Sequence, residues 1–456
     1  MKYLFLNIKQ FKYIFLGLFL WLMLWAGYNT GIYRVFTPGF PAGTMDLFHG
    51  VRAFSPIIAG ILAVVFLAVK RNFTKKYFCG AMGFLSLYCA VGIISSTLSK
   101  NLITALYWAL TYGAVLLVLW FVTAREESLK DFSYIINANW IIAGLIAVGL
   151  LVFFLIQPGA IQSLNWGNIF FGDARPYEGL SDVTAEVSTL GMAGTRPTGF
   201  GRYAGIVAII SLAGIFYSRK KQKYFWLVSL VLSTLILFFA KGRTEIVGFL
   251  FGGVILSWFS GRKKISFVFF IALLIFLFNL FGFGNVILNS QKRTIDKPVV
   301  GVGEDISNPA QVDVGLNKSV ITLSGRTSGV WKDDWNLFLS SPLIGYGFQA
   351  DRIFLQGQHA HNAILQALVQ TGLVGTIFFI LAVIYTWVVL MRLLQNKKII
   401  GKERNILMQL FGVLLFFTVR GITESSGAFF SADWLFLAPV IAYIQFLYVN
   451  EPNKTL

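Results

Sequence analysis

Long apolar segments alternate with short polar ones along almost the whole chain. A helix needs roughly 20 apolar residues to cross the hydrocarbon core of a bilayer, which is about 30 Å thick. The pattern predicts about twelve such helices, at residues 13–27, 51–69, 77–94, 102–122, 134–156, 203–217, 224–240, 246–259, 265–280, 361–391, 406–419 and 434–449. We therefore expect an all-α, polytopic membrane protein, with residues 1–456 forming a single transmembrane helical domain.

The composition agrees with this pattern. Hydrophobic residues make up 56% of the chain, charged residues only 13%, and the mean hydropathy is +0.71. About a quarter of the residues of a soluble domain are charged, so a soluble protein is excluded. Lys, Arg, Asp and Glu fall at the ends of the apolar segments or between them. An ionisable residue inside a span is the usual sign of an ion pathway, and the pattern therefore disfavours a coupled transporter.

The net charge of +18 raises the question of nucleic-acid binding. Most of the excess cations lie in alternate loops, such as Lys70-Arg71, residues 219–221, residues 262–264 and residues 392–404. This is the positive-inside distribution of a membrane protein. It places both termini on the inner side and makes a nucleic-acid partner unnecessary.

The longest polar interruption, residues 281–360, lies on the outward side between the ninth and tenth spans. Within it, Trp331, Trp335 and Phe338 recur at helical spacing among polar residues, which predicts an amphipathic helix on the membrane surface. Asp333 and Asp334 are adjacent and point apart on a helix, so we interpret them as a solvated face rather than as metal ligands. Long loops between membrane helices are a usual place for catalytic residues.

Two of the three histidines follow this helix. His361 begins the tenth span, at a membrane boundary, where a histidine can act as a general base near neutral pH. His359 is a possible auxiliary residue; the alternative is a structural histidine pair. Together with Asp351 the two histidines suggest a metal site, but no third ligand has a convincing spacing, and we expect neither a metal nor another cofactor.

Several outward arginines are candidates for binding an anion. Arg326 precedes the amphipathic helix, and Arg243 lies with Lys241 in the tight turn at residues 241–245. Arg196 and Arg202 close the outward loop before the sixth span. Guanidinium groups bind phosphate oxygens in a bidentate manner; the alternative is contact with lipid headgroups.

These residues together resemble a known family. The run Ser324-Gly325-Arg326, then Trp331, Pro342, Gly345-Tyr346-Gly347, His361-Asn362, Leu365 and Gly372-Leu373-Val374-Gly375, is similar to the signature of the O-antigen ligase and polymerase superfamily. The twelve-span layout with a large outward loop and the Arg243 turn are similar too. Two departures stand out: Lys241-Gly242 replaces the hydroxylated residues usual before the arginine, and residues 195–202 lack the Pro-Asn often seen before the sixth span.

The resemblance implies a bacterial inner-membrane glycosyltransferase with a periplasmic active site and cytoplasmic termini. Its donor would be a glycan on undecaprenyl pyrophosphate, and its acceptor a lipid A-core sugar. The ligases are similar in being metal-independent inverting enzymes. By analogy His361 would be the base, and Arg243 and Arg326 would hold the pyrophosphate, with Arg196 or Arg202 in support.

Other functions remain open at this point. An O-antigen polymerase would use the same donor with a second lipid-linked glycan as acceptor, and a protein O-oligosaccharyltransferase is a third relative. A lipid-glycan flippase or exporter belongs to another class and would need polar residues along a transmembrane path. A metal-dependent glycosyltransferase is disfavoured because the first outward loop offers only Asp46.

Overall fold

The fold was analysed in a computed structural model. It describes the chain at residues 44–70, 79–124, 129–156, 197–218, 220–239, 242–280, 329–355 and 359–450. Every regular element in these ranges is a helix. The first half holds α3 (Thr44–Lys70), α4 (Ala81–Ser95), η2 (Ser96–Leu98), α5 (Leu102–Ala124), α6 (Leu129–Ile156), α9 (Pro197–Tyr217) and α10 (Lys220–Phe239). The second half holds α11 (Arg243–Phe259), α12 (Lys263–Leu280), α14 (Trp331–Ser340), α15 (Ala350–Phe354), α16 (Ala363–Gln395), α17 (Gly401–Arg420) and α18 (Ala432–Asn450).

The all-α prediction is confirmed, and a helix occupies each predicted span from the second to the twelfth. Among the described residues, five helices are long and apolar enough to cross a membrane, at Ala81–Leu98, Leu102–Thr123, Lys221–Phe238, Ala363–Gln395 and Ala432–Asn450. The chain is a multi-pass membrane protein. The total of about twelve spans stays a prediction, and the first predicted span lies outside the described residues.

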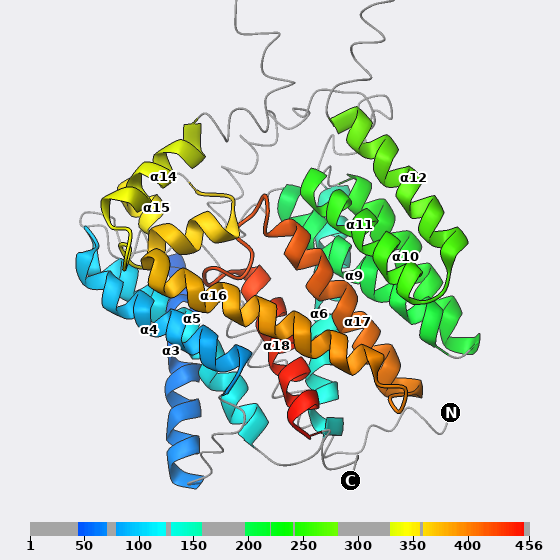
Figure 1. The fold of residues 1–456 in the computed structure, drawn as a ribbon, viewed down its shortest axis with the longest axis horizontal. Helices are drawn as coiled ribbons and strands as arrows, with labels where there is room; N and C mark the ends of the chain where they lie inside the picture. Colours follow the sequence, from blue (N-terminus) through cyan, green and yellow to red (C-terminus); the bar gives the residue numbers. More distant parts are fainter. Residues whose placement is uncertain are drawn as a thin grey trace, which may run out of the picture.

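The helices form two groups around a central one. In Figure 1, α3, α4 and α5 lie on one side, α9 to α12 lie on the other, and α16 runs across between them. The apolar segment of α18 is 83% buried, whereas that of α10 is 17% buried. The helix α18 is therefore the core of the described bundle, and α10 belongs to its outer edge.

Several helices begin before the predicted span, and one of these differences affects a candidate residue. Arg202 was expected in a loop before a span starting at residue 203, but α9 begins at Pro197 and includes Arg202 in its second turn. Proline suits the first position of a helix, because its fixed φ is helical and its missing N–H has no partner there in any helix. The extra turn carries Arg202 into the bundle.

The amphipathic helix was predicted correctly, but its faces were not. In α14 the fully buried side chains are Asp334 and Phe338, while Trp335 is 48% exposed. The small apolar cluster of Phe338, Ala350 and Val369 packs α14 and α15 against α16. The expectation of a solvated Asp334 is thus corrected: its neighbour Asp333 is exposed, and Asp334 is not.

The helix α16 is broken at Gly372, whose backbone has φ 60° and ψ −164°. Beyond the break, residues 373–395 are about 35 Å long at about 1.5 Å per residue, which is enough to cross a bilayer alone. The first part of α16, which follows His361, is therefore a separate short helical segment before the break.

The loop before α15 inserts into this break. In an unbroken helix the N–H groups of Leu373 and Val374 would donate to the carbonyls of Val369 and Gln370. They donate instead to the loop carbonyls of Pro342 (2.8 Å) and Leu343 (3.1 Å). The two freed carbonyls accept the N–H groups of Tyr346 (3.1 Å) and Gly347 (2.8 Å). These two N–H groups and two carbonyls of α16 therefore all keep backbone partners.

Glycine is required on both sides of this contact. A Cβ on Gly372 would lie 2.3 Å from the Leu343 carbonyl carbon, and one on Gly345 would lie 2.6 Å from the Thr371 nitrogen. Both glycines also have positive φ, a conformation that side chains disfavour. The two glycine motifs of the sequence therefore have a common structural origin.

Candidate active site

His361 lies in the short segment between α15 and α16. Its Nδ1 is 3.0 Å from Oε2 of Glu424, in the loop between α17 and α18. Its side chain is 32% exposed, so a substrate can approach the ring. The next residue, Asn362, caps α16 by accepting the Leu365 N–H at 2.9 Å and donates to the Ile422 carbonyl at 2.9 Å. The segment is thus held against the same loop at two points.

His359 belongs to a second, more buried pair. Its Nδ1 is 3.0 Å from Oδ2 of Asp351, which is completely buried. Its ring centroid is 4.7 Å from that of His361. Burial lowers the pKa of His359, and the Asp351 carboxylate opposes this shift only in part. Burial also opposes ionisation of Asp351, but the hydrogen bond and charge of His359, together with Arg352 and Gln366, give Asp351 a lowered pKa.

Arg243 is the first residue of α11, and its neighbour Thr244 connects it to the His361 region. Oγ1 of Thr423 donates to Oγ1 of Thr244 at 3.1 Å. Thr423 directly precedes Glu424, the partner of His361. One short loop therefore contacts both the arginine turn and the histidine segment, which lie far apart in the sequence.

A buried ionic network lies behind this loop. Arg420 donates through Nε to Glu245 at 3.1 Å and through Nη1 to Asp433. Asp433 also lies 2.7 Å from Nε of Arg202 and accepts a hydrogen bond from Ser426 at 2.7 Å. We call Arg202, Glu245, Arg420 and Asp433 the ionic network. It joins the ends of α9, α11, α17 and α18, and its two cations balance its two anions.

The helix dipoles favour this arrangement. Glu245 and Asp433 lie in the first turns of α11 and α18, and Arg420 ends α17. Anions at helix N-termini and cations at C-termini are each stabilised by the macrodipole. Because Arg420 and Glu245 are each only 1% exposed, the pairs replace water as the partners of these charges.

The network explains one of the departures from the family pattern. A Cβ on Gly242 would lie 2.4 Å from Oε2 of Glu245. Any side chain at position 242 would therefore displace the carboxylate that holds Arg420. Glycine before Arg243 makes room for the ionic network.

The structure brings four of the candidate residues close to the α17–α18 loop or its neighbours. His359 and His361 lie in the 359–362 segment, and Arg243 begins α11 next to Thr244, which contacts the loop at Thr423. Arg202 is paired with Asp433. Arg326, Arg196 and Lys241 lie outside the described residues. Among the residues that are described, no group of three or more His, Cys, Asp and Glu side chains is arranged to hold a metal ion.

Sequence reasoning missed Glu424 and the ionic network. Each member lies at a helix end, where charged residues of a membrane protein are ordinarily read as exposed. The available signal was the presence of Glu424, Arg420 and Asp433 around one short outward loop of mostly small residues. A loop of that composition can bury its charges against neighbouring helices.

A comparison with known protein families indicates the class of protein in which this candidate site occurs. The family model described as O-antigen ligase matches residues 228–380. The match covers 153 of the 456 residues, about a third of the chain. The resemblance to the O-antigen ligase and polymerase superfamily is confirmed, and with it a membrane enzyme of the glycosyltransferase type. No curated protein matches the chain.

The matched O-antigen ligase segment contains only part of the candidate site. It runs from α10 to the middle of α16 and includes the Arg243 turn, α14, Asp351 and both histidines. Glu424, Arg420 and Asp433 follow it in the chain. The loop that joins the arginine turn to His361 thus comes from outside the matched O-antigen ligase segment.

Proposed function

We propose that this protein transfers a glycan from undecaprenyl pyrophosphate to a sugar hydroxyl of lipid A-core, as an O-antigen ligase. The observation that carries the proposal is the His361–Glu424 pair, joined through Thr423 to the Arg243 turn. A histidine that acts as base and an arginine that binds the leaving anion would suit a reaction in which an alcohol attacks and a pyrophosphate leaves. The family match supports the same class of reaction.

The proposed role of His361 is that of general base. With Nδ1 donating its proton to Glu424, Nε2 carries the free lone pair. It would take the proton of the acceptor hydroxyl as that oxygen bonds to the anomeric carbon of the donor. The bond from this carbon to the pyrophosphate oxygen breaks, and attack from the opposite face inverts the anomeric configuration. The Glu424 carboxylate would stabilise the imidazolium that forms.

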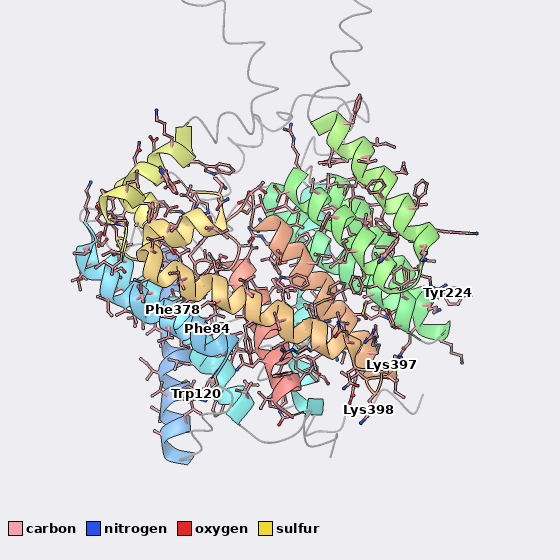
Figure 2. The ribbon with its side chains drawn as sticks, in the orientation of Figure 1. Phe84, Trp120, Tyr224, Phe378, Lys397 and Lys398 are labelled. Atoms are coloured by element: carbon pink, nitrogen blue, oxygen red, sulfur yellow. The ribbon has the colours of Figure 1, made fainter. Side chains whose placement is uncertain are left out.

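The proposed role of Arg243 and Arg326 is to bind the donor pyrophosphate. The donor pyrophosphate is already anionic and gains one further negative charge as the glycosidic bond breaks, and cations positioned there stabilise the transition state. The first turn of α11 adds backbone N–H groups and a positive helix end to the Arg243 side. The proposed chemistry takes place at the periplasmic face of the inner membrane. In Figure 2, Lys397 and Lys398 lie at the end of α16 opposite to α14 and α15, as the positive-inside rule expects for a cytoplasmic turn.

Transfer by the purified chain tests the proposal directly. The full chain in detergent, given a lipid-linked glycan and lipid A-core, is expected to form the joined product in the presence of a chelator. His361→Ala should reduce the rate by about 10²- to 10⁴-fold, the usual contribution of a general base. Normal transfer by this variant would disprove the role of His361, and loss of activity in chelator would disprove the metal-independent reaction.

The acceptor is tested separately. Cells lacking the gene should lose surface polymer and accumulate polymerised lipid-linked glycan. Accumulation of single units would instead indicate a polymerase, and transfer to protein in the purified system an O-oligosaccharyltransferase. Movement of the lipid-linked glycan across vesicles without any transfer would indicate a flippase.

A further inference from the structure

The tripeptide His359-Ala360-His361 is held in place by a single carboxylate, that of Asp351. Oδ2 of Asp351 accepts from the Ala360 N–H at 3.2 Å and lies 3.0 Å from Nδ1 of His359. Its other oxygen accepts from Nε2 of Gln366 at 2.8 Å. Asp351 thus fixes one side chain and one backbone N–H directly before His361.

Two further contacts hold the same tripeptide. Nε1 of Trp331, at the start of α14, donates to the Ala360 carbonyl at 2.7 Å. Ring contact with Phe429, at a centroid distance of 5.2 Å, orients His359 from the other side. The polar groups of Ala360 are therefore both used, and the backbone here is fully determined by its surroundings.

Such anchoring is needed because the His361 backbone is strained. His361 has φ 49°, in the left-handed region, which is strained for a residue other than glycine because of its Cβ. Strain of this kind persists only where neighbouring contacts hold it. Without them the segment would relax toward ordinary backbone angles and turn the imidazole away from Glu424.

The charge state of the buried pair also matters for His361. The neighbouring imidazole is 4.7 Å away, and two cations at that distance would repel each other. The lowered pKa values of His359 and Asp351 correspond to a neutral imidazole on an ionised carboxylate at neutral pH. A negative charge therefore lies one ring away from the group that must become positive.

We infer that Asp351 and His359 are positioning residues for His361, and this inference rests on the proposed role of His361 as base. The pair holds His361 in its strained backbone conformation and in contact with Glu424. It also leaves His361 as the histidine that takes the acceptor proton. His359 itself receives no proton from the substrate.

Two substitutions at His359 separate positioning from chemistry. In His359→Asn the amide nitrogen stands near the position of Nδ1 and can still donate to Asp351, but the variant has no base. In His359→Phe the ring is kept and the donor is lost. We expect the transfer rate of His359→Asn to stay within about threefold of the wild type. We expect His359→Phe to lower kcat by about tenfold or more, as is found for other residues that orient a functional side chain. KM for the donor should change little in both.

A third substitution tests the charge. In Asp351→Asn the nearby anion is lost, so the His361 imidazolium is less stabilised and the acid limb of the kcat profile should move to lower pH. Asp333→Asn removes the same charge from an exposed site on α14 and should leave the profile unchanged. A merely structural defect would lower the rate at every pH without moving the limb. Size-exclusion chromatography in detergent checks that each variant is folded.

Each outcome has one meaning. If His359→Asn and His359→Phe are both as inactive as His361→Ala, His359 takes part in the chemistry and the inference is wrong. It is also wrong if both retain full activity, or if Asp351→Asn behaves as Asp333→Asn does. If His361→Ala is active, the proposed function itself is wrong. If His361→Ala is inactive but His359→Phe has normal activity, only the positioning role of His359 is wrong.

Discussion

Glu424 Oε2 and His361 Nδ1 lie 3.0 Å apart although 63 positions separate them in the sequence. The contact joins the loop between α17 and α18 to the residue that precedes α16. A carboxylate in this position selects one tautomer of the imidazole and stabilises its cation. In the proposed reaction, the loop would thus help His361 to act as the base.

Removing this carboxylate should reduce catalysis without removing the base. We expect Glu424→Gln to lower kcat by more than about tenfold but by less than His361→Ala, whose loss is about 10²- to 10⁴-fold. Donor binding should be nearly unchanged, because Glu424 contacts the base and not the pyrophosphate. The measurement is steady-state transfer by purified variants. Equal kcat for Glu424→Gln and the wild type would show that the contact has no role in the reaction.

The ionic network should be more important for stability than for rate. Arg420→Met leaves Glu245 and Asp433 buried with a partner removed, and breaking a buried pair typically costs 3–5 kcal/mol. Thermal unfolding in detergent should show a clearly lowered Tm. The matched control is Lys397→Met on the exposed α16–α17 turn, where surface substitutions change stability by about 0.5 kcal/mol or less. Similar Tm values for the two variants would contradict the importance of the network.

The insertion of the loop into α16 predicts a strong effect of one methyl group. Gly372→Ala would place Cβ 2.3 Å from the Leu343 carbonyl and put alanine at φ 60°. We expect a loss of at least about 2 kcal/mol in stability, from strain and overpacking together. Gly144→Ala is the control, because a Cβ there meets nothing within 4 Å. Equal Tm values for the two variants would argue against the inserted loop.

Asp334 predicts a pH dependence of stability. Burial, with Asp351 and Asp333 nearby, raises its pKa to about 8, and neither carboxylate oxygen has a hydrogen-bond partner in the described structure. Between its ordinary pKa of about 4 and this value, the folded chain keeps a proton that the unfolded chain releases. Unfolding free energy therefore falls as pH rises from about 4 to about 8 and levels off above.

Substitution isolates this contribution. Asp334→Asn cannot ionise, so the stability difference between variant and wild type should grow in favour of the variant as pH rises to about 8. Asp333→Asn, at the adjacent exposed position, should not change with pH in this way. The readout is Tm in detergent at several pH values. Parallel curves for Asp334→Asn and the wild type would place the Asp334 carboxyl in a solvated environment.

The helices, and the positions of several candidate residues at helix ends, could be predicted because their signals are local. Apolar run lengths predicted α4, α5, α16 and α18, and the spacing of aromatic residues predicted α14. His361 and Arg243 were found from residue type and position at a helix end. The family match agrees with the motif around them.

The contacts between distant residues could not be predicted in the same way. Nothing near Glu424 in the sequence indicates that its partner is His361, and Arg420 meets Glu245 across 175 positions. The faces of α14 were predicted wrongly because Trp335 is apolar and Asp334 is charged. The packing of α14 against α16 nevertheless buries Asp334 and leaves Trp335 exposed. A local sequence pattern indicates which residues favour burial, but it does not indicate which side chains the neighbouring helices can accommodate.

The insertion of the loop before α15 into the break in α16 has a consequence for how the newly synthesised chain folds. The carbonyls of Val369 and Gln370 acquire their donors from residues 346 and 347, which leave the ribosome earlier and belong to the segment preceding the helix. The N-terminal segment of α16, residues 363–372, therefore cannot be completed as an autonomous helix, and it reaches its final form only when residues 342–347 fold back onto it. Formation of the His361 region is thus coupled to the folding of a segment that precedes it in the chain.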